Sequence, residues 1–379
     1  MPYESVDQLQ KILMEDVFYY AQDSKKAAGR SLGTIVEIIT FYLLKSWGVT
    51  ESISIERRIP EFGNPAITHN VEFSLHPVYK KHSLTLANDN RSITANRLLK
   101  MLQPSLGEQT FEKLNNALLT KNRVLRNACT IARNENSHLV ASIEKLNQDS
   151  VVVSVAQQGI KPYAIFECKR VGVEEGSKKG PQTIEKAKQG AYVATSVSSL
   201  QKVRLESGEL FGVIYLDDKV MYSEPYHVLL KRIIDSDDPR LLRNFVLTVG
   251  IVSNHGNWFT SENQNKELKV LAQSYDRLVF LSDDGITEFV QELILHPAPR
   301  YQSIREAFIA SYAPGKTKNR FTKVRMSLDA DRTLLEYFAL NDERISKWFN
   351  VISPAAGSLQ HLRNDIGALH NKTWQDILK

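Results

Sequence analysis

The sequence predicts an α/β protein in which strands and helices mix within one region of the chain. From residue 150 onward, short runs rich in β-branched and aromatic residues predict strands at 151–155, 163–167, 211–216, 245–252 and 278–281. Helix-patterned stretches lie between these runs, at about 181–199, 224–235 and 263–274. The composition agrees, because 42% hydrophobic and 24% charged residues are typical of a globular protein and exclude a disordered or collagen-like chain.

The first half of the chain begins with a helical pattern. Apolar residues recur too densely between 31 and 47 for a surface helix, and Gly48 stands where a helix would end, so we expect a buried helix there. Two β-like runs follow, at 52–57 and 70–75. From about 84 to 146 the chain is polar with helix-patterned apolar residues, which predicts a helical insertion.

The C-terminal part of the chain carries no strand pattern. Helical patterns run from about residue 300 to the end, so we expect a helical C-terminal region at 300–379. Residues 1–299 would form one domain, with the helical insertion at about 84–146 and the core at about 147–299.

Charge and cysteine content exclude several classes of protein. The formal net charge of +5 permits a nucleic-acid partner without indicating one. Two cysteines, Cys129 and Cys168, cannot form a disulfide framework or a four-thiolate zinc site, and they suit a reducing compartment. The most apolar stretch, 34–47, is interrupted by Glu37 and Lys45, so we expect no membrane span. With no signal-peptide pattern at the N-terminus, a cytoplasmic protein is the expectation.

The stretch 149–169 carries the most informative charged residues. If its two β-like runs form an antiparallel hairpin that turns around Gln158, Asp149 lies opposite Glu167, and Lys169 lies on the same face of the sheet as Glu167. Two carboxylates roughly 5 Å apart repel each other unless a cation lies between them, and their hard oxygens suit Mg²⁺. Lys169 could then orient an attacking water or neutralise charge on a phosphate. This set suits phosphodiester hydrolysis.

Asp149 followed by Glu167-Cys168-Lys169 at the end of an apolar strand resembles the signature of the PD-(D/E)xK nucleases, although Gln148 stands where the family name has proline. The resemblance implies a mixed central sheet flanked by helices and cleavage of nucleic acid that depends on Mg²⁺, for which Mn²⁺ can substitute. It also implies that Asp149, Glu167 and Lys169 are catalytic. The metal would be bound by Asp149, Glu167 and the backbone carbonyl of Cys168.

Two other acidic residues are candidates for the metal site. Glu37 lies on the predicted buried helix, where a carboxylate is costly, and some members of the resembled family add a glutamate from an N-terminal helix. Glu72, in the run 70–75, competes with Asp149 for the role of the upstream metal ligand. Both residues could instead face solvent.

The chain after the predicted catalytic strand resembles the family in a further respect. A basic loop with Lys178 and Lys179 precedes a helix, and some branches of the family place a functional glutamine and tyrosine on such a helix. Gln189 and Tyr192 lie three residues apart on one face of it. Lys178 and Lys179 could contact DNA phosphates or form a solvated face.

A second basic cluster lies near the C-terminus. The segment 315–325 carries five basic residues and no acidic residue, with Phe321 among them. Lys316, Lys318 and Arg320 are the predicted contacts to a DNA backbone, and a solvated linker is the alternative.

These observations together predict a type II restriction endonuclease that cuts both strands of double-stranded DNA at a specific site. Because such sites are often two-fold symmetric, the expected assembly is a homodimer, with the C-terminal region binding DNA or mediating dimerisation. A repair or recombination nuclease of the same superfamily is one alternative. A non-catalytic DNA-binding protein on a degenerate nuclease fold is the other.

Overall fold

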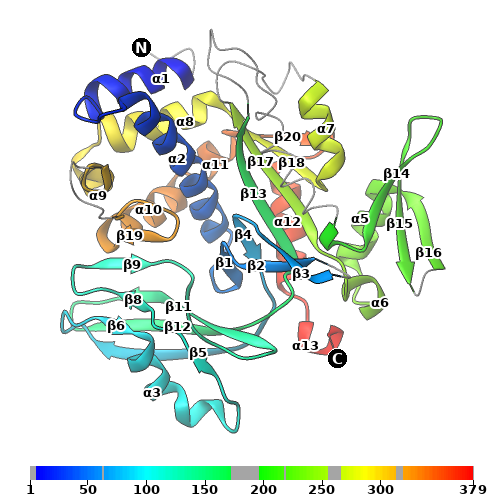
Figure 1. Ribbon diagram of the computed structural model, residues 1–379, viewed down its shortest axis with the longest axis horizontal. Coiled ribbons are helices and arrows are strands. Elements are labelled where there is room, and N and C mark those ends of the chain that lie inside the picture. Colours follow the sequence, from blue (N-terminus) through cyan, green and yellow to red (C-terminus); the bar gives the residue numbers. More distant parts are fainter. Residues whose placement is uncertain are drawn as a thin grey trace.

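A six-stranded mixed sheet lies at the centre of the computed structural model, which describes residues 6–61, 64–171, 196–216, 219–254, 266–312 and 319–378. Across the sheet the strands are β1 (Ile53–Ile55), β4 (Phe73–Leu75), β13 (Ala164–Val171), β17 (Leu247–Asn254), β18 (Arg277–Leu281) and β20 (Phe349–Ser353). Neighbours β13, β17 and β18 are parallel, whereas the pairs β1–β4, β4–β13 and β18–β20 are antiparallel. Helices flank this mixed sheet, which confirms the predicted α/β class (Figure 1).

The long helix α2 (Ser24–Ser46) forms much of the core beside the sheet. Asp23 caps its N-terminus by accepting a hydrogen bond from the backbone N–H of Lys26, and the chain leaves the helix through Gly48 at a φ of +81°. Within the described ranges it is the only helix long and apolar enough to span a membrane. It is mostly buried within the protein, as the core helix of a soluble protein is. The buried helix predicted at 31–47 is therefore confirmed.

The remaining helices pack around the sheet in both halves of the chain (Figure 1). Before the C-terminal region they are α1 (Val6–Ile12), α5 (Tyr226–Asp235), α6 (Pro239–Leu242), α7 (Lys266–Ser274) and α8 (Asp283–Val290). The helices of the C-terminal region are α9 (Gln302–Tyr312), α10 (Leu328–Leu340), α11 (Asp342–Ser346), α12 (Leu359–His370) and α13 (Trp374–Ile377). The predicted helices at 224–235 and 263–274 correspond to α5 and α7.

The segment 84–146 is mainly a second β structure, so the predicted helical insertion is wrong. Its only helix among the described residues is α3 (Ala95–Leu106). A five-stranded sheet has the order β5 (Val78–Ala87), β12 (Ser150–Gly159), β11 (Ser137–Leu146), β10 (Cys129–Arg133) and β7 (Glu112–Lys113). These strands have a hydrophobic cluster of their own and many exposed polar residues, and in the sequence this mixture resembles a helical pattern.

Three smaller sheets complete the described fold. One has the order β19 (Arg325–Ser327), β9 (Val124–Arg126), β8 (Ala117–Leu119) and β6 (Ile93–Thr94). Another contains β14 (Leu200–Arg204), β15 (Leu210–Leu216) and β16 (Lys219–Pro225), and the last pairs β2 (Arg58–Glu61) with β3 (Asn64–Asn70). Strand β19 is contributed by the C-terminal region and pairs with β9 of the insertion.

The C-terminal region completes the central core. Strand β20 forms an edge of the central sheet, so the prediction that no strand follows residue 299 is wrong. Helix α10 is joined to α2 through Asp331, which accepts a hydrogen bond from Tyr42 Oη at 2.7 Å and lies 2.9 Å from Lys45 Nζ. Side chains of α10 and α12 belong to the same hydrophobic cluster as α2 and the sheet.

A buried ion pair ties α12 to β18 and gives a test of this arrangement. Asp365 Oδ2 lies 2.6 Å from Arg277 Nη2, and both side chains are almost fully buried. Asp365→Ala is expected to lower the free energy of unfolding by about 3–5 kcal/mol, because it leaves a buried guanidinium without its partner. Urea denaturation measures this loss. Asp342→Ala, which removes the partner of Arg363 in a half-exposed pair, is the control and should cost less than about 1 kcal/mol; equal losses would contradict the packing of α12 on the sheet.

Candidate active site

Strand β13 positions the predicted acid and lysine side by side. Glu167 and Lys169 lie on the same face because side chains of a strand alternate, and Lys169 Nζ is 2.6 Å from Glu167 Oε1. Only 7% of Glu167 is exposed, which makes its carboxylate an unusual charge in a buried strand. The thiol of Cys168 is buried in the hydrophobic cluster that contains α2.

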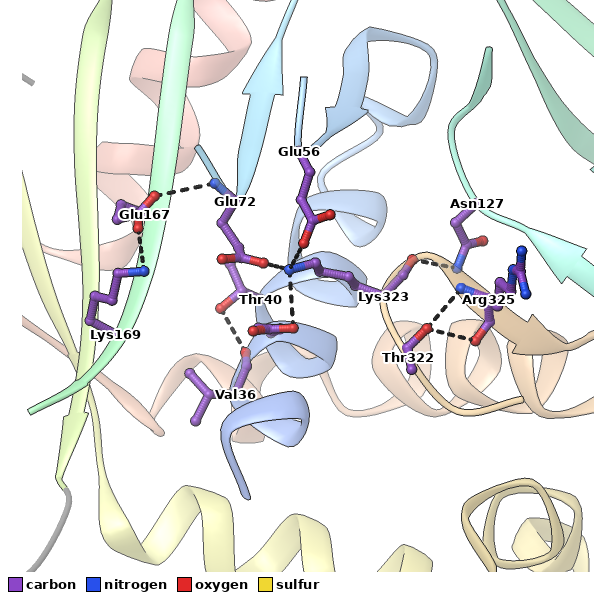
Figure 2. Close-up of polar contacts among 11 residues, drawn as sticks. Val36, Thr40, Glu56, Glu72, Asn127, Glu167, Lys169, Thr322, Lys323 and Arg325 are labelled. Carbon is purple, nitrogen blue, oxygen red and sulfur yellow. Dashed lines mark hydrogen bonds and ion pairs between the residues drawn. The ribbon is translucent and has the colours of Figure 1, made fainter. Parts of the chain in front are cut away.

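Strand β4 brings Glu72 to Glu167. In the antiparallel register Phe73 is paired with Phe166, so Glu72 lies next to Glu167 at the end of the ladder. The backbone N–H of Glu72 donates a hydrogen bond to Glu167 Oε2 at 3.2 Å (Figure 2). The structure thus brings the competing candidate Glu72, which is 9% exposed, to the acid on β13.

The predicted hairpin that would have placed Asp149 opposite Glu167 is wrong. Strand β12 pairs with β5 and β11 in the five-stranded sheet, whereas β13 pairs with β4 and β17 in the central sheet. Asp149 is exposed and precedes β12, beside Asn88. The other end of this ten-residue strand, Gly159, is the end that contacts the chain after β4, through His76 and Pro77. Asp149 therefore does not lie beside Glu167.

A buried lysine from the C-terminal region lies among three glutamates. Lys323 Nζ is 3.2 Å from Glu37 Oε2 on α2, 2.9 Å from Glu56 Oε1, and in contact with Glu72 Oε1 (Figure 2). Lys323 is 6% exposed. Glu56 has a φ of +49°, a left-handed conformation that costs free energy in a residue other than glycine, and its N–H bonds to the carbonyl of Glu72.

A tight turn holds Lys323 in this position. Phe321 and Met326 form a β-bridge across the turn, and Thr322 is hydrogen-bonded to Arg325 through its backbone and its hydroxyl. Asn127 fixes the turn from outside, since its side-chain amide donates to the carbonyl of Lys323 at 3.0 Å (Figure 2). The ammonium is therefore held by a defined loop structure.

The site carries more carboxylates than ammonium groups. Four carboxylates, those of Glu37, Glu56, Glu72 and Glu167, face the ammonium groups of Lys169 and Lys323. Burial raises the pKa of Glu167, an effect that the ammonium of Lys169 opposes. Burial also raises the pKa of Glu37, and Lys323 opposes that shift. For Lys169, burial lowers the pKa but the carboxylate of Glu167 outweighs it, so the pKa is raised and the amine stays protonated.

The donors around Lys323 are carboxylate oxygens, the ligands that Mg²⁺ prefers. Within the described ranges, no group of three or more His, Cys, Asp or Glu side chains could hold a metal ion as arranged. In the structure the ammonium of Lys323 occupies the position on which Glu37, Glu56 and Glu72 converge. Lys323 is therefore the cation that these three carboxylates share.

Sequence reasoning missed Glu56 and the role of Lys323. Glu56 lies inside the predicted β-like run 52–57 without a distinguishing motif, and Lys323 is one of several lysines in a basic segment. The only sequence signal that distinguishes Lys323 is the aromatic residue two positions earlier, Phe321. The structure shows that Phe321 is fully buried.

Of the other predicted contact residues, only Arg320 lies within the described ranges; it is half-buried and directly precedes the turn that holds Lys323. Lys178, Lys179, Gln189, Lys316 and Lys318 lie outside the described residues.

No known family model, no curated protein and no solved structure matches the chain. The arrangement itself offers a buried carboxylate on β13, a second on the residue before β4, a third on α2 and a lysine paired with Glu167. Carboxylates beside a lysine are the side chains that a divalent cation and an attacking water would need.

Proposed function

We propose that this protein is a Mg²⁺-dependent endonuclease of the PD-(D/E)xK type that hydrolyses double-stranded DNA at a specific site, as type II restriction endonucleases do. The observation that carries the proposal is the contact between Glu72 and Glu167 at the end of the β4–β13 pairing, where the backbone N–H of Glu72 donates to Glu167 Oε2, with Lys169 Nζ 2.6 Å from Glu167. The mixed sheet with α2 beside it and Glu37 on that helix supports the same family.

In this proposal Glu72 takes the role that the resemblance gave to Asp149. Glu72 and Glu167 would hold the metal with the backbone carbonyl of Cys168, and Glu37 would add a carboxylate from α2. Bound Mg²⁺, or Mn²⁺ in its place, supplies a Lewis acid that polarises the phosphate and lowers the pKa of a water ligand.

In this proposal Lys169 is the residue that interacts with the attacking water. Its amine is protonated beside Glu167, so it donates hydrogen bonds and orients the water rather than removing a proton. The same positive charge stabilises the negative charge that builds on the phosphate in the transition state. The burial of Glu167 strengthens its attraction to Lys169, because water screens this pair less than it screens a fully exposed pair.

Lys323 neutralises the carboxylates that would otherwise repel one another. Its ammonium keeps Glu37, Glu56 and Glu72 together, and it would have to leave their centre for these residues to hold a divalent cation there. The same contact favours the second candidate, a non-catalytic DNA-binding protein in which the lysine permanently replaces the metal. A repair nuclease of the same superfamily remains the alternative within the enzyme class.

Incubation with phage DNA in Mg²⁺ separates these functions. Discrete fragments with reproducible ends, carrying 5′-phosphates and 3′-hydroxyls, are expected for a restriction enzyme. Nicking confined to branched or single-stranded substrates would indicate a repair nuclease, and binding without cutting would indicate the non-catalytic protein. We further propose a cytoplasmic homodimer, since two-fold symmetric DNA sites are matched by two-fold symmetric proteins.

Cleavage is expected to require Mg²⁺ or Mn²⁺. Ca²⁺ should support DNA binding without cutting, because its looser coordination positions the water poorly. Gel assays of cleavage and anisotropy measurements of binding, each in the three metals and in EDTA, check this. Full cleavage in excess EDTA would contradict a metal-dependent mechanism.

A further inference from the structure

A basic cavity lies on the other side of the turn that holds Lys323. Its volume is about 370 Å³, within the range of small-ligand sites. Residues from β9, from the turn and from the loops beside β8 line it, and none of the lining residues is acidic. The lining residues that matter here are Arg126, Arg320, Arg325, Asn116, Asn122 and Asn319.

The arginines of this cavity lie close together without a balancing acid. Arg126 and Arg325 are directly opposed in the antiparallel register of β9 and β19, a placement that destabilises a sheet when the charges are alike. In the part of the chain that the structure describes, no carboxylate forms an ion pair with Arg126, Arg320 or Arg325. The Nε atom of Arg320 is buried without a hydrogen-bond partner. A bound anion would remove both costs.

The cavity also offers groups that contact bases. Asn122 and Asn319 are exposed at its rim, and an amide side chain presents one acceptor and two donor hydrogens. Amides and guanidinium groups are the side chains that read base edges, whereas arginines also bind phosphates through paired hydrogen bonds. This combination fits a nucleotide better than it fits a simple anion.

The turn connects this cavity to the proposed catalytic centre. Lys323 points toward the glutamates, whereas the side chain of Arg325, two residues later, lies on the opposite side of the turn (Figure 2). A ligand held by Arg320 and Arg325 would therefore lie beside the centre, at a phosphate other than the one being cleaved.

We infer that this cavity binds a nucleotide of the nucleic-acid substrate that flanks the cleaved bond. Arg126, Arg320 and Arg325 hold its phosphate, and the asparagines contact its base. The inference rests on the proposed function for the identity of the substrate, but its test uses binding rather than cleavage.

The test measures the affinity of a fluorescein-labelled DNA duplex by anisotropy in Ca²⁺, over a series of salt concentrations. Arg126→Gln and Arg325→Gln are each expected to weaken binding roughly tenfold and to reduce the log–log salt slope by up to about one unit per lost phosphate contact. Arg243→Gln is the matched control, because Arg243 is an exposed arginine that follows α6, far from β9 (Figure 1). Its affinity and slope should equal those of the unmodified protein.

The melting temperature of each variant shows whether its fold is intact. Removing one of two opposed like charges should leave the melting temperature unchanged or raise it, so weaker binding cannot be ascribed to a damaged fold. Unchanged affinity and slope in both variants, or no DNA binding by the unmodified protein, would overturn the inference. Binding that depends on the arginines but occurs without any cleavage would support the inferred nucleotide site and contradict the proposed nuclease activity. Cleavage that is insensitive to both substitutions would support the nuclease activity and contradict the inferred nucleotide site.

Discussion

Glu167→Gln is expected to lower the rate of DNA cleavage in Mg²⁺ by at least about 100- to 1,000-fold, with DNA binding in Ca²⁺ retained. Glutamine keeps the shape and can still accept the hydrogen bond from the backbone N–H of Glu72, but it removes the charge that holds both the metal and Lys169. Lys169→Met should cause a loss of similar size, because it deletes the ammonium that orients the water. The measurement is the initial cleavage rate at saturating DNA.

The control for this prediction is Glu343→Gln, which neutralises an exposed glutamate on α11. It should cut at the rate of the unmodified protein. The fold of Glu167→Gln is expected to persist, because burial already disfavours the charged form of this side chain. A Glu167→Gln variant that folds and cuts normally would contradict the assignment of the active site.

Lys323→Met is expected to make the stability of the protein depend strongly on a divalent cation. Methionine fills the space of the lysine stem but leaves Glu37, Glu56 and Glu72 without their shared counter-ion. Without divalent cations the free energy of unfolding should fall by roughly 2–3 kcal/mol, less than for a fully buried pair because Glu56 is half-exposed. Mg²⁺ at about 100 times its Kd should restore about 2.7 kcal/mol.

Urea denaturation with and without Mg²⁺ measures this effect, and Lys347→Met, at an exposed lysine, is the control. The Mg²⁺ concentration that gives half-maximal cleavage should also fall, by roughly tenfold, since the variant has no ammonium to displace. If Lys323→Met were as stable as Lys347→Met in EDTA and responded equally to Mg²⁺, the lysine would not occupy the cation position in solution.

Local patterns were sufficient to predict the elements that carry the site. The density of apolar residues predicted α2, and the apolar run before Glu167 predicted β13, because both elements are buried on most of their surface. Strand pairing could not be predicted in the same way. The partner β4 ends at Leu75, far upstream of β13, and the second sheet is inserted between them, whereas the predicted turn around Gln158 lies within β12, which continues to Gly159.

The complete site depends on contacts that no local pattern encodes. Glu37, Glu56, Glu72 and Glu167 come from four separate segments, and Lys323 reaches them from a turn that Asn127 of the insertion holds in place. A lysine in a basic segment predicts a surface contact to phosphate. Lys323 is instead buried among glutamates, because the C-terminal region packs on α2.

The Mg²⁺-dependent cleavage rate of Glu72→Gln, measured beside that of Asp149→Asn, tests the central claim most directly. If the site is built across β4 and β13, Glu72→Gln loses cleavage while it still binds DNA in Ca²⁺. Asp149→Asn cuts at the rate of the unmodified protein, because Asp149 is exposed and precedes β12 of the five-stranded sheet. An active Glu72→Gln together with an inactive, folded Asp149→Asn would contradict the proposed site.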